Sequence, residues 1–244
     1  MSTVMLLYKQ VVPLSREAHM KFRLKPVTDF SFAKEVHWMP VAGAEFFQCS
    51  RYFPIVFVKE NEGFRPIILL SLEVKNNEFV ENGEWKQGAY IPAFVRRYPF
   101  MLANINAESK ELTVCLDPTY DGWNEAEGRE LFKQDGGNSE FLSEMLQFMS
   151  GFNVEMQRTT EFMKEINSLN LLVKRSVDIR SADGQTFHVQ DLYMIDEEAL
   201  RKLSGVELEK FNKAGMLGWI FAHLASLSNL SVLFDMQRAR KAAA

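Results

Sequence analysis

Cysteine and histidine are scarce in this chain of 244 residues. The two cysteines, Cys49 and Cys115, are far apart and lack Cys-x-x-Cys spacing, so we expect buried, reduced thiols and no disulfide framework. The histidines are His19, His37, His188 and His223. None of them has a partner at the spacing of a metal site, and the sequence therefore predicts no bound metal.

Motifs for nucleotides and for hydrolysis are also missing. The glycines of Gly215-Met-Leu-Gly218 have no lysine beside them and fall in a predicted helix, so we expect no nucleotide cofactor. A cluster of His223 with Ser226 and Ser228 contains a base and hydroxyl groups, but no Gly-x-Ser-x-Gly elbow accompanies it. The pattern assigns no catalytic residue.

An excess of basic charge and a long hydrophobic run are lacking as well. The net charge is -4 and the pI is about 5.7, whereas nucleic-acid-binding proteins usually carry a basic face. The most apolar run, residues 214–225, contains His223 and falls short of the roughly 20 residues that span a bilayer. The apolar stretch 4–7 is too short for a signal sequence. We expect a cytoplasmic protein with no nucleic-acid partner and no membrane insertion.

The first half of the chain has the pattern of β structure. Short apolar runs bounded by turn residues predict strands over residues 54–58, 66–72 and 112–116. Asn82-Gly83 predicts a tight hairpin, because both residues tolerate positive φ. Residues 43–52 are interpreted as a short helix that buries Phe46, Phe47 and Cys49.

The second half has helical periodicity. Apolar residues recur at intervals of three and four over residues 141–169 and predict a long amphipathic helix, with a kink or a division into two helices at Ser150-Gly151. A methionine face on this helix is either core or an adaptable groove: Met145, Met149, Met156 and Met163. Weak alternation around Asp183-Gly184 predicts a second hairpin.

A last helix is predicted over residues 207–227, after a helix whose N-cap is Asp196. Small residues recur every four positions on one face of the last helix: Ala214, Gly218, Ala222 and Ser226. Another backbone can approach such a face closely. We expect packing against a neighbouring helix of the same chain, with a homodimer seam as the alternative.

Together these elements predict an α+β fold. A β-rich part, about residues 1–134, is covered by a mainly helical part, about residues 135–244, that adds one further hairpin. Because the strands need helices to cover their faces, we expect the two parts to share one core in a single domain, residues 1–244.

The most distinctive segment is residues 90–100, Tyr-Ile-Pro-Ala-Phe-Val-Arg-Arg-Tyr-Pro-Phe. Its two prolines confine any helical turn to residues 93–97. Arg96 and Arg97 are thereby held beside Tyr90 and Tyr98, an arrangement that suits a planar anion. The alternative is an internal ion pair with a carboxylate in an apolar segment, for which the candidates are Glu45, Glu73 and Asp117.

These segments resemble the SapC family, which is named after a protein associated with a bacterial surface layer. The resemblance covers most of the chain. Besides residues 90–100, it is carried by Pro40-Val-Ala-Gly-Ala-Glu45-Phe46, Tyr52-Phe-Pro54-Ile-Val-Phe57, Asn77-Glu-Phe79-Val80, Gly215 and Ala222-His-Leu-Ala-Ser-Leu-Ser-Asn229. The chain departs from the family's pattern at Ser71 and Glu78, which puts the end of the second strand in question.

Resemblance to this family implies a bacterial protein linked to surface-layer or envelope processes, without implying a reaction. We therefore expect a binding or accessory protein whose partner is another protein, or a peptide or anionic small ligand. The alternatives are an enzyme acting on a peptide or small molecule, with a pocket around the arginine pair and His223, and a structural surface-layer component. The candidate binding residues are Glu45, Tyr90, Arg96, Arg97, Tyr98 and His223.

Overall fold

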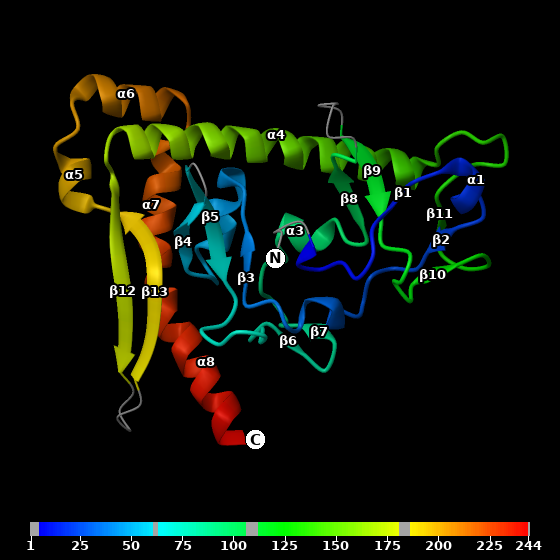
Figure 1. The fold of residues 1–244 in the computed structure, drawn as a ribbon, viewed down its shortest axis with the longest axis horizontal. Coiled ribbons are helices and arrows are strands. Elements are labelled where there is room, and N and C mark those ends of the chain that lie inside the picture. The colour runs from blue at the N-terminus through cyan, green and yellow to red at the C-terminus, as the bar shows by residue number, and fades with distance from the viewer. Residues whose placement is uncertain (1–4, 61–62, 106–111, 181–185, 244) are drawn as a thin grey trace.

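A single long helix, α4 (Glu140–Ser168), extends along most of the protein, and the strands pack beneath it (Figure 1). The structure is a computed structural model that describes residues 5–60, 63–105, 112–180 and 186–243. The Ser139 hydroxyl caps α4 by accepting a hydrogen bond from the backbone N–H of Leu142. The expected division at Ser150-Gly151 is wrong, because α4 is continuous over its 29 residues. An exposed glycine costs a helix only about 1 kcal/mol, which the buried residues on either side offset.

The largest sheet draws strands from both halves of the sequence. Its order is β12 (Leu172–Arg180), β13 (Thr186–Ile195), β4 (Ile55–Glu60), β5 (Gly63–Leu69) and β3 (Trp38–Pro40), and all neighbours are antiparallel. The strands predicted at 54–58 and 66–72 are confirmed as β4 and β5. The predicted second hairpin is confirmed by the pairing of β12 with β13, although Asp183-Gly184 lies outside the described residues.

Two smaller sheets and a hairpin complete the β structure. One sheet has the order β1 (Val12–Pro13), β9 (Thr113–Leu116), β8 (Phe100–Ala103), and the other β10 (Trp123–Asn124), β2 (Arg23–Leu24), β11 (Arg129–Glu130). A short helix, α1 (Arg16–His19), lies between β1 and β2 in the sequence. The hairpin β6 (Val80–Glu81) and β7 (Glu84–Trp85) confirms the prediction at Asn82-Gly83, whose φ angles are 50° and 81°.

Short helices connect these sheets. They are the 3₁₀ turns η2 (Ser31–Ala33) and η3 (Gly43–Glu45) and the helix α2 (Phe46–Cys49). The helix predicted at 43–52 is thus confirmed, and Phe46 and Cys49 are buried as expected. The expectation for Phe47 is wrong: it is 59% exposed, and its ring lies against Gly218 at the surface.

The C-terminal part contains four helices among the described residues: α5 (Glu197–Arg201), α6 (Gly205–Lys213), α7 (Leu217–Ser226) and α8 (Asn229–Ala243). Asp196 caps α5, as predicted, by accepting from the N–H groups of Glu198 and Ala199. The prediction of one helix over 207–227 is wrong, because Gly215 has a φ of 71° between α6 and α7.

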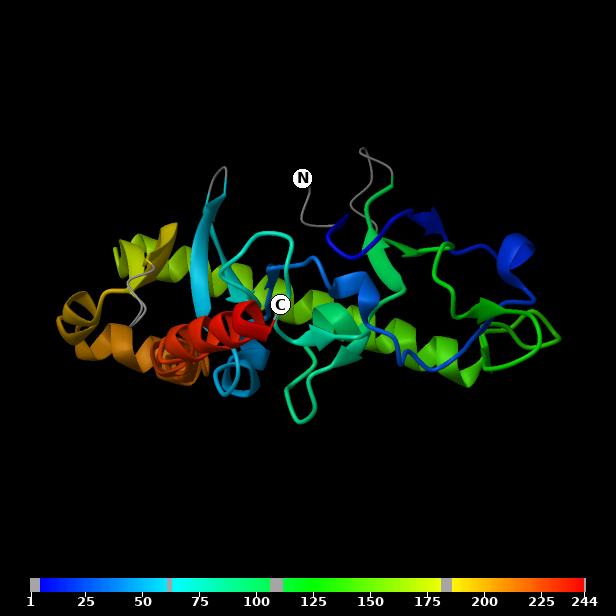
Figure 2. The same cartoon turned by 90° about the horizontal axis from the view of Figure 1, so that it is seen from below.

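The small-residue face packs inside the chain, as expected, but only over α7. Because Gly218 has no side chain, α2 can approach α7 closely and the Phe47 ring lies against this glycine. Ala222 and Ser226 are buried. Ala214 lies beyond the end of α6 and outside this contact. In the two views, α4 and α8 are on opposite sides of the protein with the strands between them (Figure 2).

By length and composition alone, the segment Leu217–Ala242 could cross a membrane, with a mean hydropathy of 1.5 in its most apolar window. Within the protein, 44% of that window is buried, and core helices pass the same test. The expectation of no membrane insertion therefore stays a prediction.

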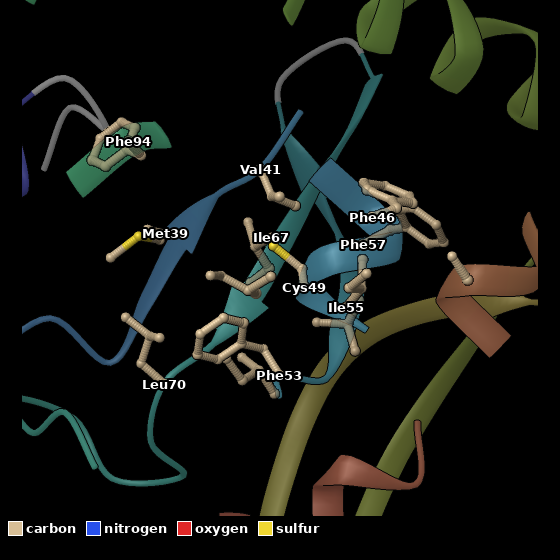
Figure 3. Close-up of a cluster of buried hydrophobic side chains, with 14 of the residues drawn as sticks. Met39, Val41, Phe46, Cys49, Phe53, Ile55, Phe57, Ile67, Leu70 and Phe94 are labelled. Carbon is tan, nitrogen blue, oxygen red and sulfur yellow. The ribbon is translucent and has the colours of Figure 1, made fainter. Parts of the chain in front are cut away.

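The main hydrophobic core lies between the five-stranded sheet, α2, α4 and α7, and part of it is shown in Figure 3. Phe53, Ile55 and Phe57 are completely buried there. A second cluster under the N-terminal end of α4 contains Phe100 and Leu142. The fold is thus α+β, with most strands in the first half and most helices in the second. Both cysteines are free and buried, as predicted.

Candidate functional site

The distinctive segment 90–100 forms a short helix that is anchored by its apolar residues. Pro92 is extended, with φ -61° and ψ 149°, and the helix α3 (Ala93–Arg96) follows it, as predicted from the two prolines. Phe94 and Val95 are buried in the main core. The backbone that carries both arginines is therefore fixed in place.

Glu45, at the end of η3, is the acidic partner of this helix. Its Oε1 accepts hydrogen bonds from the Tyr90 hydroxyl at 2.8 Å and from the Ala93 backbone N–H at 2.7 Å. The side chain is only 10% exposed, and its other oxygen, Oε2, is buried and has no hydrogen-bond partner in the described part of the chain. Burial, followed by the charge of Glu45, raises the pKa of Tyr90. Glu45 is thus a buried carboxylate with only one oxygen satisfied.

Arg96 lies beside this carboxylate but is half exposed. Its Nη2 is 3.8 Å from Glu45 Oε1 and donates to the Tyr90 hydroxyl at 3.1 Å. Its guanidinium also lies over the ring of Phe148, 5.1 Å from the centroid. The predicted ion pair with Glu45 is confirmed.

The two other predicted carboxylate partners bind different groups. Glu73 forms ion pairs with Arg240 and Lys241. Asp117 accepts hydrogen bonds from the backbone N–H of Lys9 and from Thr119. Both carboxylates therefore bind groups other than Arg96 and Arg97.

Arg97 lies among aromatic rings on a different side of α3. Its guanidinium carbon is 4.1 Å from the ring centroid of Phe94, 5.8 Å from that of Tyr8 and 5.6 Å from that of Phe152. Its Nε is buried without a hydrogen-bond partner. Burial raises the pKa of Tyr8 to about 12, although the charge of Arg97 opposes this change.

A hollow of about 180 Å³ adjoins Arg97, and we call it the Arg97 hollow. Apart from Arg97, Arg65 and Asn153, its walls are apolar and include Leu102, Met149 and Met156. The predicted methionine face thus contributes to the core, through Met149 and Met163, and to the wall of the Arg97 hollow, through Met149 and Met156.

A second hollow of about 420 Å³ lies between η3, α3 and α4, and we call it the Glu45 hollow. Its acidic lining residues are Glu45, Glu144 and Glu155, and its small ones are Ala42, Ala44, Ala93 and Gly151. Gln147, Phe148 and Phe152 complete it. Phe152 lines both hollows, so the two are neighbours.

Tyr98 and His223 line neither hollow. Tyr98 is buried and stacks on Phe32, with centroids 3.9 Å apart, and burial raises its pKa. His223 is completely buried: Nδ1 donates to the Ile55 carbonyl at 2.8 Å, and Nε2 accepts from the Ile195 N–H at 3.1 Å. Burial lowers the pKa of His223 to about 4. Of the predicted site residues, the structure brings Glu45, Tyr90 and Arg96 together. It places Tyr98 and His223 in the core.

Several lining residues escaped the sequence reasoning. Phe148 and Phe152 have the periodicity of core positions, and Arg65 lies within a strand, so nothing local marks them. Gly151 did carry a signal, since a glycine inside a long helix is unusual. The sequence predicts a break at this glycine, whereas α4 continues through it and leaves open space over the Glu45 hollow.

Within the described ranges, no three His, Cys, Asp or Glu side chains are grouped so that they could hold a metal ion. The Cys49 thiol is buried close to Glu45, and burial raises its pKa well above the ordinary value. Such a thiol is a poor nucleophile, because the thiolate is the reactive form.

Comparison with known proteins gives one match. A family model described as SapC matches residues 14–233, a range that includes both hollows. No curated protein and no solved structure matches the chain.

Proposed function

The chain belongs to the SapC family, and we propose that it is a cytoplasmic binding or accessory protein linked to surface-layer or envelope processes. In this proposal, the 90–100 segment is part of the recognition surface. Arg97 binds the anionic group of a peptide or small ligand whose apolar end enters the Arg97 hollow.

The observation that carries the proposal is the state of the Arg97 guanidinium. It lies on the Phe94 ring, and its Nε is buried without a hydrogen-bond partner. An unsatisfied buried donor is costly, and a carboxylate or phosphate group in the hollow would offset that cost through charge-assisted bonds to the guanidinium of Arg97, which lines the hollow. The hollow beside it is slightly larger than the engineered cavities of about 150 Å³ that hold benzene, so it suits a group the size of one ring.

The placement of His223 supports binding over catalysis. A general base needs a nitrogen that can reach the substrate, and both nitrogens of His223 are engaged with backbone groups. Ser226, the nearest candidate nucleophile, donates to the His223 carbonyl and accepts from the Ile55 N–H. The cluster of these two residues holds α7 to β4.

The test uses 3-phenylpropionate, which joins a single ring to a carboxylate, and measures its binding to the full chain by calorimetry. We expect binding in the millimolar range, a loss of about tenfold or more in Arg97→Gln, and partial retention in Arg97→Lys. Asn153→Phe, which fills the hollow from α4, should also abolish binding.

The uncharged probe 3-phenylpropanol serves as the control for the carboxylate. Equal affinities for the two probes, or unchanged binding of the carboxylate in folded Arg97→Gln, would refute the role of Arg97. Thermal melts monitored by circular dichroism establish that each variant is folded.

A further inference from the structure

The Glu45 hollow contains an acceptor that lacks a donor. Glu45 Oε1 already accepts from Tyr90 and Ala93, but Oε2 is buried without any partner. Leaving one charged oxygen unsatisfied in a side chain that is only 10% exposed is unfavourable. Arg96, the nearest cation, lies 3.8 Å from the other oxygen and directs hydrogen bonds to Tyr90 and to the Ile91 carbonyl.

The charged residues that line the hollow are all acidic, and each acid also has an arginine neighbour outside the lining. Its lining includes three carboxylates and neither lysine nor arginine among the described residues. Two of the carboxylates are paired outside it, Glu144 with Arg129 at 2.6 Å and Glu155 with Arg158 at 2.9 Å. Glu45 differs from them because its second oxygen has no partner among the described residues.

The walls favour a ligand that has an apolar body. Phe148 and Phe152 present aromatic surface, and Ala42, Ala44 and Ala93 leave room beside it. On α4, a Cβ added at Gly151 would meet no atom within 4 Å, so the helix leaves this side of the hollow open. A ring or short alkyl chain can therefore lie along α4 while its charged end points at η3.

We propose that the Glu45 hollow binds a small primary amine. Its ammonium group donates to Glu45 Oε2, and its apolar body lies against Phe148 and Phe152. A primary ammonium is compact and has three N–H donors, so it can approach a buried oxygen that a trimethylated nitrogen cannot.

This inference goes beyond the proposed function and does not depend on it. The Arg97 hollow takes an anion and the Glu45 hollow takes a cation, with Phe152 between them. The matched probes are 3-phenylpropionate and 3-phenylpropylamine, which differ only in the charged group. Each proposal can therefore fail while the other holds.

The experiment measures binding of 3-phenylpropylamine to the full chain at pH 7.5 by calorimetry, with N,N,N-trimethyl-3-phenylpropylammonium as the matched probe without N–H donors. We expect the primary amine to bind at least about tenfold more tightly, because one charge-assisted hydrogen bond accounts for that ratio. Equal affinity for the two cations would overturn the proposal.

Two variants locate the site and one serves as a control. Glu45→Gln removes the charge but keeps an acceptor for Tyr90 and Ala93, and we expect it to weaken amine binding about tenfold or more. Gly151→Leu places a side chain in the open space and should block binding while retaining a good helix former.

Glu161→Gln alters an exposed acid of α4 that lines neither hollow and pairs with Lys164, and its affinity should stay within about twofold of the unaltered protein. Unchanged binding in Gly151→Leu would show that the amine binds elsewhere and would overturn the assignment. If Glu45→Gln fails to fold, Gly151→Leu and the trimethylated probe still decide the outcome.

Discussion

Lowering the pH from 7 to 5 is expected to destabilise the protein through one buried histidine, His223. Its Nδ1–H donates to the Ile55 carbonyl, and its Nε2 accepts from the Ile195 N–H. The neutral ring thus links α7 to β4 and β13. A proton added at Nε2 would face the N–H of Ile195, so protonation replaces a hydrogen bond with two opposed donors, besides charging a fully buried ring.

The magnitude follows from the difference in pKa between the folded and unfolded states. Burial lowers the pKa of His223 from its ordinary value of 6.5 to about 4. Between these values the unfolded chain binds the proton and the folded protein does not, so stability falls as the pH falls. The contribution is complete above pH 6.5 and is lost toward pH 4 at about 1.4 kcal/mol per pH unit, which gives about 2 kcal/mol between pH 7 and 5.

Urea unfolding at pH 7 and pH 5 measures this loss, and His223→Gln isolates it. Glutamine keeps a donor and an acceptor at this position but does not titrate. Carboxylates elsewhere also change protonation over this range, and their contribution is common to both proteins. We expect the free energy of unfolding to fall by about 2 kcal/mol more in the unaltered protein than in the variant.

Two results would contradict this reasoning. One is an equal loss of stability in the two proteins between pH 7 and 5. The other is an NMR titration of the His223 ring with a midpoint near 6.5 in the folded protein, which would mean that water reaches the ring. A midpoint near 4, with stability that becomes less pH-dependent in His223→Gln, is the expected outcome.

Two glycine substitutions have opposite expected effects, and both are measured by urea unfolding at pH 7. Gly43→Ala should destabilise by about 1–3 kcal/mol, because its Cβ would lie 2.3 Å from the buried Trp219 ring; an unchanged stability would mean that Trp219 shifts freely. Gly151→Ala should stabilise by about 1 kcal/mol, since its Cβ meets open space on an exposed helix face; a destabilisation would show that the helix needs a glycine there.

Features of the fold that depend on neighbouring residues could be predicted from the sequence. Asn82-Gly83 suits positive φ whatever surrounds it, and Asp196 caps α5 through N–H groups two and three residues away. Features that depend on distant residues could not. The placement of β13 beside β4 joins residues more than a hundred positions apart, and no local pattern encodes it.

The residues of the candidate site also fall into those that a local sequence pattern predicts and those that depend on distant parts of the chain. Glu45 could be singled out because an acid in an apolar segment needs a partner, and the structure supplies Tyr90, Ala93 and Arg96. The Glu45 hollow depends on how α4 crosses α3 and η3, and the Arg97 hollow on how α4 crosses α3 and the strands β3, β5 and β8; both are properties of the assembled fold. Phe148 and Phe152 therefore looked like ordinary core positions.

The local structure of the arginine pair assigns the two residues to different contacts. The sequence predicts an anion at Arg96 or Arg97, and adjacent residues on a helix point about 100° apart. Once residues 93–97 form a helical turn, Arg96 and Arg97 must lie on different sides of it. Arg96 pairs with Glu45 and covers Phe148, whereas Arg97 lies on Phe94 beside a separate hollow. In the proposed function a single anion therefore contacts Arg97 but not Arg96, which lies beside the carboxylate of Glu45.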